Sequence, residues 1–151
     1  MKYVVTGGAG FIGSHLVKHL LSEGHDVTII DNMYRGRLSN LHGFLEKINL
    51  VQLDILEYEK LRNYIKNADG IFHQAALTSV VESYQKQSEY HKVNVIGTEK
   101  IFKIAKEFSI KVVFASSSSV YGNITKIPIT ENFERKPINP YGKTKLEDEY
   151  L

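Results

Sequence analysis

Apolar and polar positions alternate in blocks along this chain. Short apolar runs predict five strands, at Tyr3–Thr6, Val27–Ile30, Leu50–Leu53, Gly70–His73 and Val112–Ser116. Between them, apolar residues recur every three or four positions and predict helices at Phe11–Ser22, Glu57–Asn67 and Tyr90–Phe108, while Met33–Phe44 is expected to be a loop with a short helix. Strands that alternate with helices predict an α/β fold in which helices cover both faces of a parallel sheet.

The last helix starts with a clear signal. Asn139 is a good N-cap, Pro140 suits the first helical position, and the helix is expected to run through to Leu151. No glycine or proline follows to close it. We therefore expect residues 1–151 to be the N-terminal part of a longer protein.

Composition removes several classes of function. The net charge is +2 with both signs interspersed, so no basic stripe favours nucleic acid. Without cysteine there are no disulfides or thiolate metal sites, and His15 and His19 have no further ligands, so we expect no metal. Neither a signal peptide nor a membrane-spanning run is expected, and a cytoplasmic setting fits the absence of cysteine.

A glycine-rich turn follows the first predicted strand. Gly7, Gly10 and Gly13 open the first helix, where glycines allow a tight turn and a close approach to a pyrophosphate. Asp31 ends the next strand, where a carboxylate can bind both ribose hydroxyls and would repel a 2′-phosphate. This context favours a Rossmann-type fold that binds NAD rather than NADP. Arg35 lies just beyond and is either a solvated loop charge or a contact to a phosphate.

Other candidate residues also follow predicted strands. Asp54 either caps a helix or borders an adenine, and Ala75 and Ser117 follow the fourth and fifth strands. Together with Gly7 and Asp31, these residues mark the ends of five successive parallel strands. Such ends line one edge of an open sheet, which is where ligands bind. His73, in contrast, is expected to be a core histidine.

Tyr141 and Lys145 stand four residues apart on the last helix and share one face. A free phenol ionises near pH ~10 and is a poor base at neutral pH. A fixed positive charge nearby favours the phenolate, as do a cationic nicotinamide and the first turn of a helix. This pair is therefore a candidate base for removing a proton from an alcohol.

The motifs together resemble one family, the extended short-chain dehydrogenases/reductases. The chain is most similar to their NAD-dependent nucleotide-sugar epimerase/dehydratase group, and within it to the UDP-glucose 4-epimerases. The motifs that carry the resemblance are Thr6–Gly13, Asp31-Asn32, Asp54-Ile55, His73–Ala76, Asn94–Thr98, Ser116–Gly122 and Pro140–Lys145. They occur in the family's order along the whole chain.

The resemblance implies an NAD-dependent 4-epimerase that passes through a 4-keto sugar. Its catalytic residues would be Ser117, Tyr141 and Lys145. Its cofactor-binding residues would be Gly7, Gly10, Phe11, Ile12, Gly13, Asp31, Asn32, Arg35, Gly36, Asp54, Ile55, Gln74, Ala75, Ala76, Leu77, Asn94, Tyr141 and Lys145. The substrate, a UDP-sugar, would contact Thr78, Ser117 and Tyr141.

The resemblance also implies a wider architecture. Residues 1–151 would be the NAD-binding Rossmann domain, followed by a substrate domain outside this sequence. The longer protein would form a homodimer through two long helices, of which Tyr90–Phe108 is one. Because the substrate domain is missing, residues 1–151 alone are expected to lack turnover.

Two positions depart from the family pattern. Dehydratases of the group carry an Asp-Glu pair after the catalytic serine or threonine, and decarboxylating members keep a glutamate, whereas this chain has Ser118 and Ser119. Thr78 stands where the nearest epimerases often have lysine. The first departure favours epimerisation, and the second leaves the sugar open. A dehydratase, a reductase and a non-catalytic NAD-binding module are the alternatives.

Overall fold

The computed structural model describes residues 1–151, which divide into two compact units. Unit 1 comprises Met1–Ala75 and Lys100–Ala115, and unit 2 comprises Ala76–Glu99 and Ser116–Leu151. None of the helices is both long and apolar enough to cross a bilayer.

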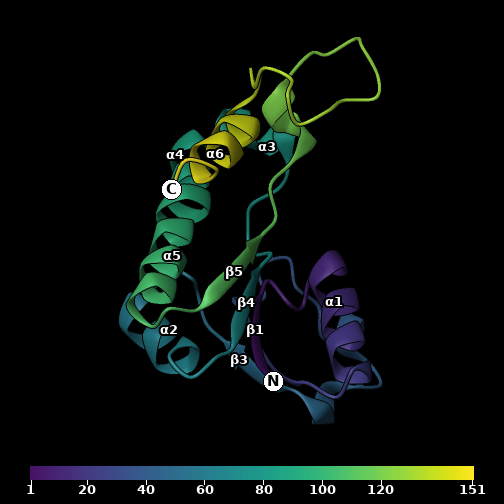
Figure 1. Ribbon diagram of the computed structural model, residues 1–151, viewed down its shortest axis with the longest axis vertical. Helices are drawn as coiled ribbons and strands as arrows, with labels where there is room; N and C mark the ends of the chain where they lie inside the picture. The colour runs from purple at the N-terminus through teal and green to yellow at the C-terminus, as the bar shows by residue number, and fades with distance from the viewer. The chain divides into compact units, whose positions relative to one another are not determined.

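Unit 1 is built on a five-stranded sheet in the order β3-β2-β1-β4-β5, with every neighbouring pair parallel (Figure 1). Its strands are β1 (Lys2–Thr6), β2 (Asp26–Asp31), β3 (Asn49–Gln52), β4 (Gly70–His73) and β5 (Lys111–Phe114). The sequence therefore predicted all five strands, although β5 ends at Phe114 rather than at Ser116. The strand order reverses between β1 and β4, and in such sheets ligands bind beyond the carboxyl ends at this point.

Helices flank this sheet on both faces. α1 (Phe11–Ser22) lies on one face, and α2 (Tyr58–Ile65) and α5 (Gly97–Glu107) lie on the other (Figure 1). The Arg62 guanidinium of α2 and the Glu107 carboxylate of α5 form an ion pair. The predicted Rossmann-type α/β architecture is thus confirmed.

The core of unit 1 on the α1 side is aliphatic. It contains Val5, Val17, Leu20, Ile29 and Leu41, all buried. Leu41 comes from a 3₁₀ turn at Leu38–Leu41, the short helix expected within the loop after β2. Burial of these side chains holds α1 and the loop after β2 in place against the strands.

Unit 2 contains the remaining helices. They are α3 (Val80–Gln85), α4 (Gln87–Tyr90) and α6 (Pro140–Asp148), with a π-helical segment at His91–Ile96 between α4 and α5 and a 3₁₀ turn at Ser118–Tyr121. The predicted helix over Tyr90–Phe108 is confirmed, except that its backbone widens to the π form over His91–Ile96. Such segments are often found at functional sites.

The prediction for α6 was right at its start and wrong at its end. Asn139 is the N-cap and Pro140 the first helical residue. The helix ends at Asp148, however, because Tyr150 and Leu151 donate their N–H groups only three residues back, to Glu147 and Asp148.

Candidate functional site

The glycine turn after β1 is packed against the turn after β4. Gly7 has a φ of 67°, and a Cβ added to it would lie 2.8 Å from the Ala75 nitrogen. The Gly7 N–H donates to Ile30 O at 2.8 Å, and the Gly10 N–H donates to Gly7 O at 3.0 Å. Only glycine suits Gly7, because the backbone needs both a left-handed conformation and the missing side chain.

The amino end of α1 is open to a ligand. Its N-cap, Gly10, has no side chain to satisfy the first N–H groups, and the first turn holds no acidic residue. Phe11 and Ile12 at this end are 76% and 67% exposed. An uncapped helix start with its positive dipole end suits a phosphate, so these residues fit the diphosphate of a dinucleotide.

Asp31 is fixed by backbone donors. It is 8% exposed, its Oδ2 accepts from the Ala9 N–H at 3.0 Å, and its Oδ1 accepts from the Met33 N–H at 2.8 Å. Each oxygen can still accept another bond, so the carboxylate can serve ribose hydroxyls. Arg35 and Gly36 lie in the loop that follows. The Arg35 guanidinium lies 5.6 Å from the centre of the Tyr34 ring.

Asp54 does not cap α2. The N-cap of this helix is Glu57, and Asp54 Oδ1 instead accepts from the Leu56 N–H at 2.9 Å within its own loop. Asp54 Oδ2 accepts from the Asn32 amide at 2.9 Å, which joins the ends of β2 and β3. The capping interpretation was therefore wrong, because the Asp54 carboxylate accepts a hydrogen bond within the turn that precedes α2 and does not reach the N–H groups of the helix. Ile55 beside it is buried.

A threonine organises the end of β4. Thr6 Oγ1 accepts from the Ala75 N–H at 3.3 Å and lies 2.6 Å from His73 Nδ1. The Gln74 N–H donates to Thr6 O at 3.1 Å. His73 is buried, as predicted for a core histidine. Thr6, the first residue of the glycine motif, thus fixes the backbone from His73 to Ala75.

In unit 2, Asn94 joins two segments from within the π-helical turn. Its Oδ1 accepts from the Leu77 N–H at 2.8 Å, and its amide donates to Leu77 O and to Thr144 Oγ1, both at 3.0 Å. Asn94 is completely buried. It therefore holds the segment of Ala76 and Leu77 to α6, whereas Thr78 is exposed.

The first turn of α6 is held by two polar side chains. Asn139 Oδ1 accepts from the Gly142 N–H at 2.7 Å, and Ser83 Oγ of α3 accepts from the Tyr141 N–H at 3.2 Å. Ser83 is fully buried and donates its own proton to Val80 O at 2.6 Å. Sequence reasoning missed Ser83, because no local pattern links it to a residue 58 positions away.

Ser117 belongs to the 3₁₀ turn at Ser118–Tyr121, which packs on α6. Its Oγ accepts from the Ser119 N–H at 3.2 Å and caps this turn. A Cβ added to Gly142 would lie 2.7 Å from Ser119 O, so the turn and α6 touch backbone to backbone. The segments of Ser117 and Tyr141 are thus neighbours within unit 2.

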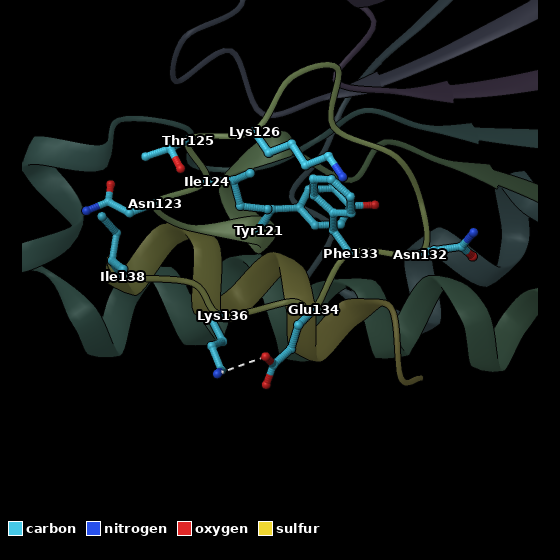
Figure 2. Close-up of a pocket in the computed structure, with 10 residues that line it drawn as sticks. All are labelled: Tyr121, Asn123, Ile124, Thr125, Lys126, Asn132, Phe133, Glu134, Lys136 and Ile138. Carbon is cyan, nitrogen blue, oxygen red and sulfur yellow. Dashed lines mark ion pairs between the residues drawn. The ribbon is translucent and has the colours of Figure 1, made fainter.

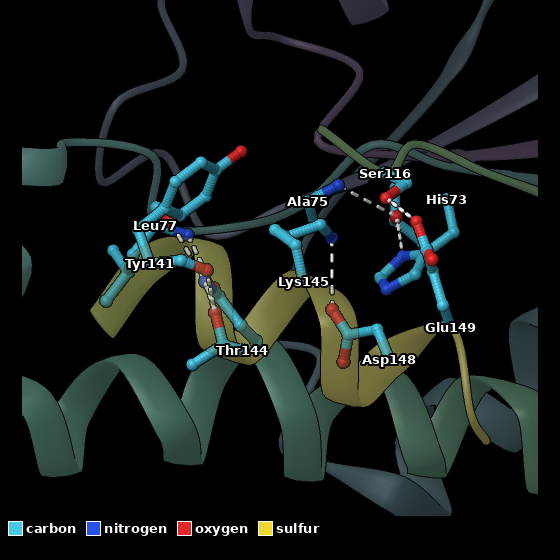
Figure 3. Close-up of polar contacts among 11 residues, drawn as sticks. His73, Ala75, Leu77, Ser116, Tyr141, Thr144, Lys145, Asp148 and Glu149 are labelled. Atoms are coloured by element: carbon cyan, nitrogen blue, oxygen red, sulfur yellow. Dashed lines mark hydrogen bonds and ion pairs between the residues drawn. The ribbon is translucent and has the colours of Figure 1, made fainter. Parts of the chain in front are cut away.

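Lys145 is buried and paired. Its Nζ lies 3.0 Å from Asp148 Oδ2, and the two side chains are 3% and 0% exposed (Figure 3). Burial lowers the pKa of Lys145, against the opposing pull of Asp148. Burial likewise raises the pKa of Asp148, from 3.8 to about 6, although the Lys145 charge opposes this rise. No pattern in the sequence singled out Asp148.

The loop between β5 and α6 lines an open pocket of about 650 Å³ in unit 2 (Figure 2). Its lining mixes aromatic rings, amides and charged groups, among them Tyr121, Phe133 and Asn132. Lys136 Nζ at its rim pairs with a Glu134 oxygen at 2.8 Å. None of the predicted catalytic or cofactor residues lines it.

The predicted residues thus form two groups. In unit 1, Gly7, Asp31, Asp54 and Ala75 follow four neighbouring parallel strands, at one edge of the sheet. In unit 2, Tyr141 and Lys145 share α6, with the segments of Leu77 and Ser117 held next to that helix. The first group lies at the carboxyl ends of these strands, and the second combines a phenol with a buried lysine.

The chain resembles known proteins over its whole length. A family profile described as GDP-mannose 4,6 dehydratase matches residues 4–151. A UDP-glucose 4-epimerase of Lactobacillus helveticus is 39% identical over 154 residues, which span 97% of this chain and 44% of that protein. A UDP-N-acetyl-alpha-D-glucosaminuronate decarboxylase of Bacillus cytotoxicus is 38% identical over 134 residues, 89% of this chain and 41% of that protein.

A solved structure agrees. The crystal structure of a UDP-glucose-4-epimerase from Stenotrophomonas maltophila, with bound NAD and formylated UDP-arabinopyranose, matches with a TM-score of 0.94 at 33% identity. The match covers 100% of this chain and 47% of that one. The chain thus spans less than half the length of these relatives.

Replacing Asn94 tests its role as a joint within unit 2. Asn94→Ala leaves the Leu77 N–H and C=O buried without these partners, so we expect a loss of about 2–3 kcal/mol in the free energy of unfolding. Urea unfolding measures it. The exposed Asn63→Ala on α2 is the control and should change stability by less than about 0.5 kcal/mol. Equal losses in both variants would contradict this role.

The raised pKa of Asp148 predicts a pH-dependent stability. Between pH 4 and 6 the folded protein keeps the Asp148 proton and the unfolded chain loses it, so stability falls as pH rises. With a rise from 3.8 to about 6, wild type should lose about 3 kcal/mol relative to Asp148→Asn by pH 7, at about 1.4 kcal/mol per unit. Denaturation series from pH 3 to 7 measure this difference, and parallel curves for the two proteins would refute it.

Proposed function

Because this chain belongs to the NAD-dependent epimerase/dehydratase family of extended short-chain dehydrogenases/reductases, we propose that it is the NAD-binding part of a nucleotide-sugar 4-epimerase. The substrate class we propose is a UDP-sugar. The crystal structure from Stenotrophomonas maltophila, which contains NAD and a UDP-sugar derivative, supports both choices by similarity.

The observation that carries this proposal is the arrangement of Tyr141 and Lys145 on α6. The helix start is anchored by Asn139 and Ser83, and Lys145 is buried one turn beyond Tyr141. A phenol one helical turn away from a buried ammonium is suited to accept a proton from an alcohol. A sensor without chemistry would not need this pair.

The residues that would hold NAD are those of unit 1 and the segment that follows it. The glycine turn and the open start of α1 would take the pyrophosphate, Asp31 and Asn32 the adenosine ribose, and Asp54 and Ile55 the adenine. Arg35 and Gly36 would border the ribose. The nicotinamide half would lie against the remaining predicted residues, Gln74, Ala75, Ala76, Leu77 and Asn94. When bound, NAD supplies a reversible acceptor for the hydrogen and electron pair of the sugar C4–H bond.

Residues of this chain would transfer the proton of the C4 hydroxyl and orient the sugar. The Tyr141 phenolate takes the proton of the C4 hydroxyl as this group becomes a ketone, and returns it when the ketone is reduced on its other face. Ser117 donates a hydrogen bond to the same oxygen and orients it, and Thr78 would also contact the sugar. Lys145 stabilises the phenolate and anchors the nicotinamide ribose. The starting and final sugars have the same oxidation state, so the cycle needs no other reductant.

A second candidate is a dehydratase or decarboxylase of the same family. The dehydratase description of the matching profile and the decarboxylase from Bacillus cytotoxicus favour it. Against it, Ser118 and Ser119 of the 3₁₀ turn follow Ser117 where those enzymes carry a carboxylate. Elimination of water needs an acid or base at that position, and neither serine provides one at neutral pH.

The proposal extends to the protein beyond this sequence. We propose that a substrate domain lies outside residues 1–151, because the relatives are more than twice as long as their matched parts. Residues 1–151 alone should therefore lack turnover. We also propose that the intact protein dimerises through the long helical segment from α4 to α5.

A comparison of NAD and NADP binding tests the proposed cofactor. Calorimetric titration of the intact protein should show tighter binding of NAD than of NADP, because the Asp31 carboxylate repels a 2′-phosphate. Asp31→Ser should narrow this preference by about tenfold or more. The exposed Asp26→Ser is the control and should leave it unchanged. Equal affinity of wild type for both nucleotides would contradict the role of Asp31.

The variant Tyr141→Phe tests the proposed role of Tyr141 as the proton acceptor. It removes the proton acceptor and keeps the ring, so turnover of a UDP-sugar should fall by at least about 10²-fold while NAD affinity changes little. Epimer formation by the intact protein, measured on a panel of UDP-sugars, provides the readout. Tyr64→Phe on α2 removes the hydroxyl of an exposed tyrosine and should have no effect. Normal turnover by Tyr141→Phe would exclude this mechanism.

A further inference from the structure

A buried carboxylate that the proposed reaction does not use lies beside the lysine that it does use. Asp148, at the end of α6, is 1% exposed. Its Oδ2 lies 3.0 Å from Lys145 Nζ, and both side chains are excluded from solvent (Figure 3). Charged pairs on a helix surface are common and contribute little, but burial makes this pair different.

Along α6, Lys145 lies between Tyr141 and Asp148. Tyr141, Lys145 and Asp148 occupy positions i, i+4 and i+7, which share one face of a helix. At about 1.5 Å of rise per residue, Asp148 is about 10 Å along the axis from Tyr141 but only about 4.5 Å from Lys145. Its charge therefore acts on Lys145 more strongly than on Tyr141.

The pair does not have the form of an interaction that serves stability alone. Asp148 Oδ1 is buried and has no hydrogen-bond partner. Removing a carboxylate from water while leaving one oxygen unsatisfied is costly, and a buried ion pair often stabilises no more than apolar residues would. An arrangement with this cost is expected where the lysine has to carry its charge in a dry environment.

Several other charged groups of unit 2 lie in ion pairs of their own. Glu147 Oε1 lies 3.3 Å from His91 Nε2 of the π-helical segment, and Glu149 Oε2 lies 2.8 Å from an Arg135 nitrogen. On α3 and α4, Lys86 lies 3.2 Å from Glu82 and 3.7 Å from Glu89. Lys92 in the π-helical segment is exposed. Asp148 is in direct contact with Lys145, and the more distant Glu149 also favours the charged form of this lysine.

We propose that Asp148 is a positioning residue, which keeps the Lys145 side chain protonated and held on the face of α6 that carries Tyr141. Without this carboxylate, burial would favour the neutral amine, and the phenolate of Tyr141 would lose the charge that stabilises it. The ion pair itself is independent of the proposed function. The consequence for turnover rests on that function.

The first experiment needs no activity. In intact protein with labelled lysine side chains, Lys145 is assigned by Lys145→Arg and titrated by NMR. Asp148→Asn has nearly the same shape, and in it the pKa of Lys145 should fall. Glu147→Gln removes the same charge one residue away on the exposed side of α6 and should leave that pKa nearly in place. An unchanged Lys145 titration in Asp148→Asn would overturn the proposal.

Wild type alone provides a second measurement if Asp148→Asn does not fold. The Asp148 carboxyl carbon should titrate near pH 6, and the Lys145 resonances should shift in the same step because the partner loses or gains its charge. If the Lys145 resonances do not shift while Asp148 titrates, the proposal is overturned as well.

The second experiment uses the pH dependence of turnover. Asp148→Asn removes the negative charge beside Lys145, so this lysine should lose its proton at lower pH. The alkaline limb of the pH–rate profile, along which the ammonium is lost, should therefore move to lower pH. Glu147→Gln should leave the profile in place, and Asp148→Glu, which restores the charge, should return it toward wild type. A merely structural role would lower the rate without moving the profile, and that result would overturn the proposal.

The two experiments separate failure of this proposal from failure of the proposed function. If wild type turns over no UDP-sugar, the epimerase assignment fails, and the Lys145 titration still decides whether Asp148 holds the lysine charge. If wild type is active and the Lys145 titration does not respond to Asp148→Asn, the epimerase assignment stands and the role of Asp148 is rejected.

Discussion

The close approach of the Gly7 and Ala75 backbones is the constraint on which the nucleotide-binding part of this fold depends. A side chain at Gly7 would collide with the Ala75 nitrogen, so the ends of β1 and β4 meet without an intervening group. Thr6 fixes the same contact from the other side, because its hydroxyl lies within hydrogen-bond reach of both Ala75 and His73. This junction is where the strand order reverses, and it leaves the open start of α1 beside the carboxyl ends of the strands.

In unit 2, a few buried polar side chains have a similar effect on α6. Ser83 and Asn139 satisfy the first N–H groups of the helix, and Asn94 ties the helix to the backbone of Leu77. Buried hydrogen bonds of this kind restrict geometry more strictly than apolar packing, because each donor and acceptor has a preferred direction. The orientation of Tyr141 and Lys145 within unit 2 therefore depends on residues that would not themselves meet a substrate.

The Lys145–Asp148 pair shows the conflict between charge and burial in this unit. A lysine in a dry environment tends to lose its proton, and a carboxylate there tends to keep one, so burial pushes both groups toward the neutral form. Their mutual attraction opposes this in both. The pair is consequently sensitive to any change in the charge of either partner, which suits a role in setting the charge near a reacting phenol.

Local patterns in the sequence determined the five strands, the limits of α1, the start of α6 and the glycine turn, because hydrophobic periodicity, capping and backbone freedom act over a few residues. Only the tertiary structure decided that Asp54 accepts from the Asn32 amide, that His91–Ile96 is π-helical, and that Ser83 holds the Tyr141 N–H. These depend on residues brought together from distant positions. The separation of Lys145 and Asp148 is visible in the sequence, but their burial is not, because the same spacing occurs on any exposed helix face.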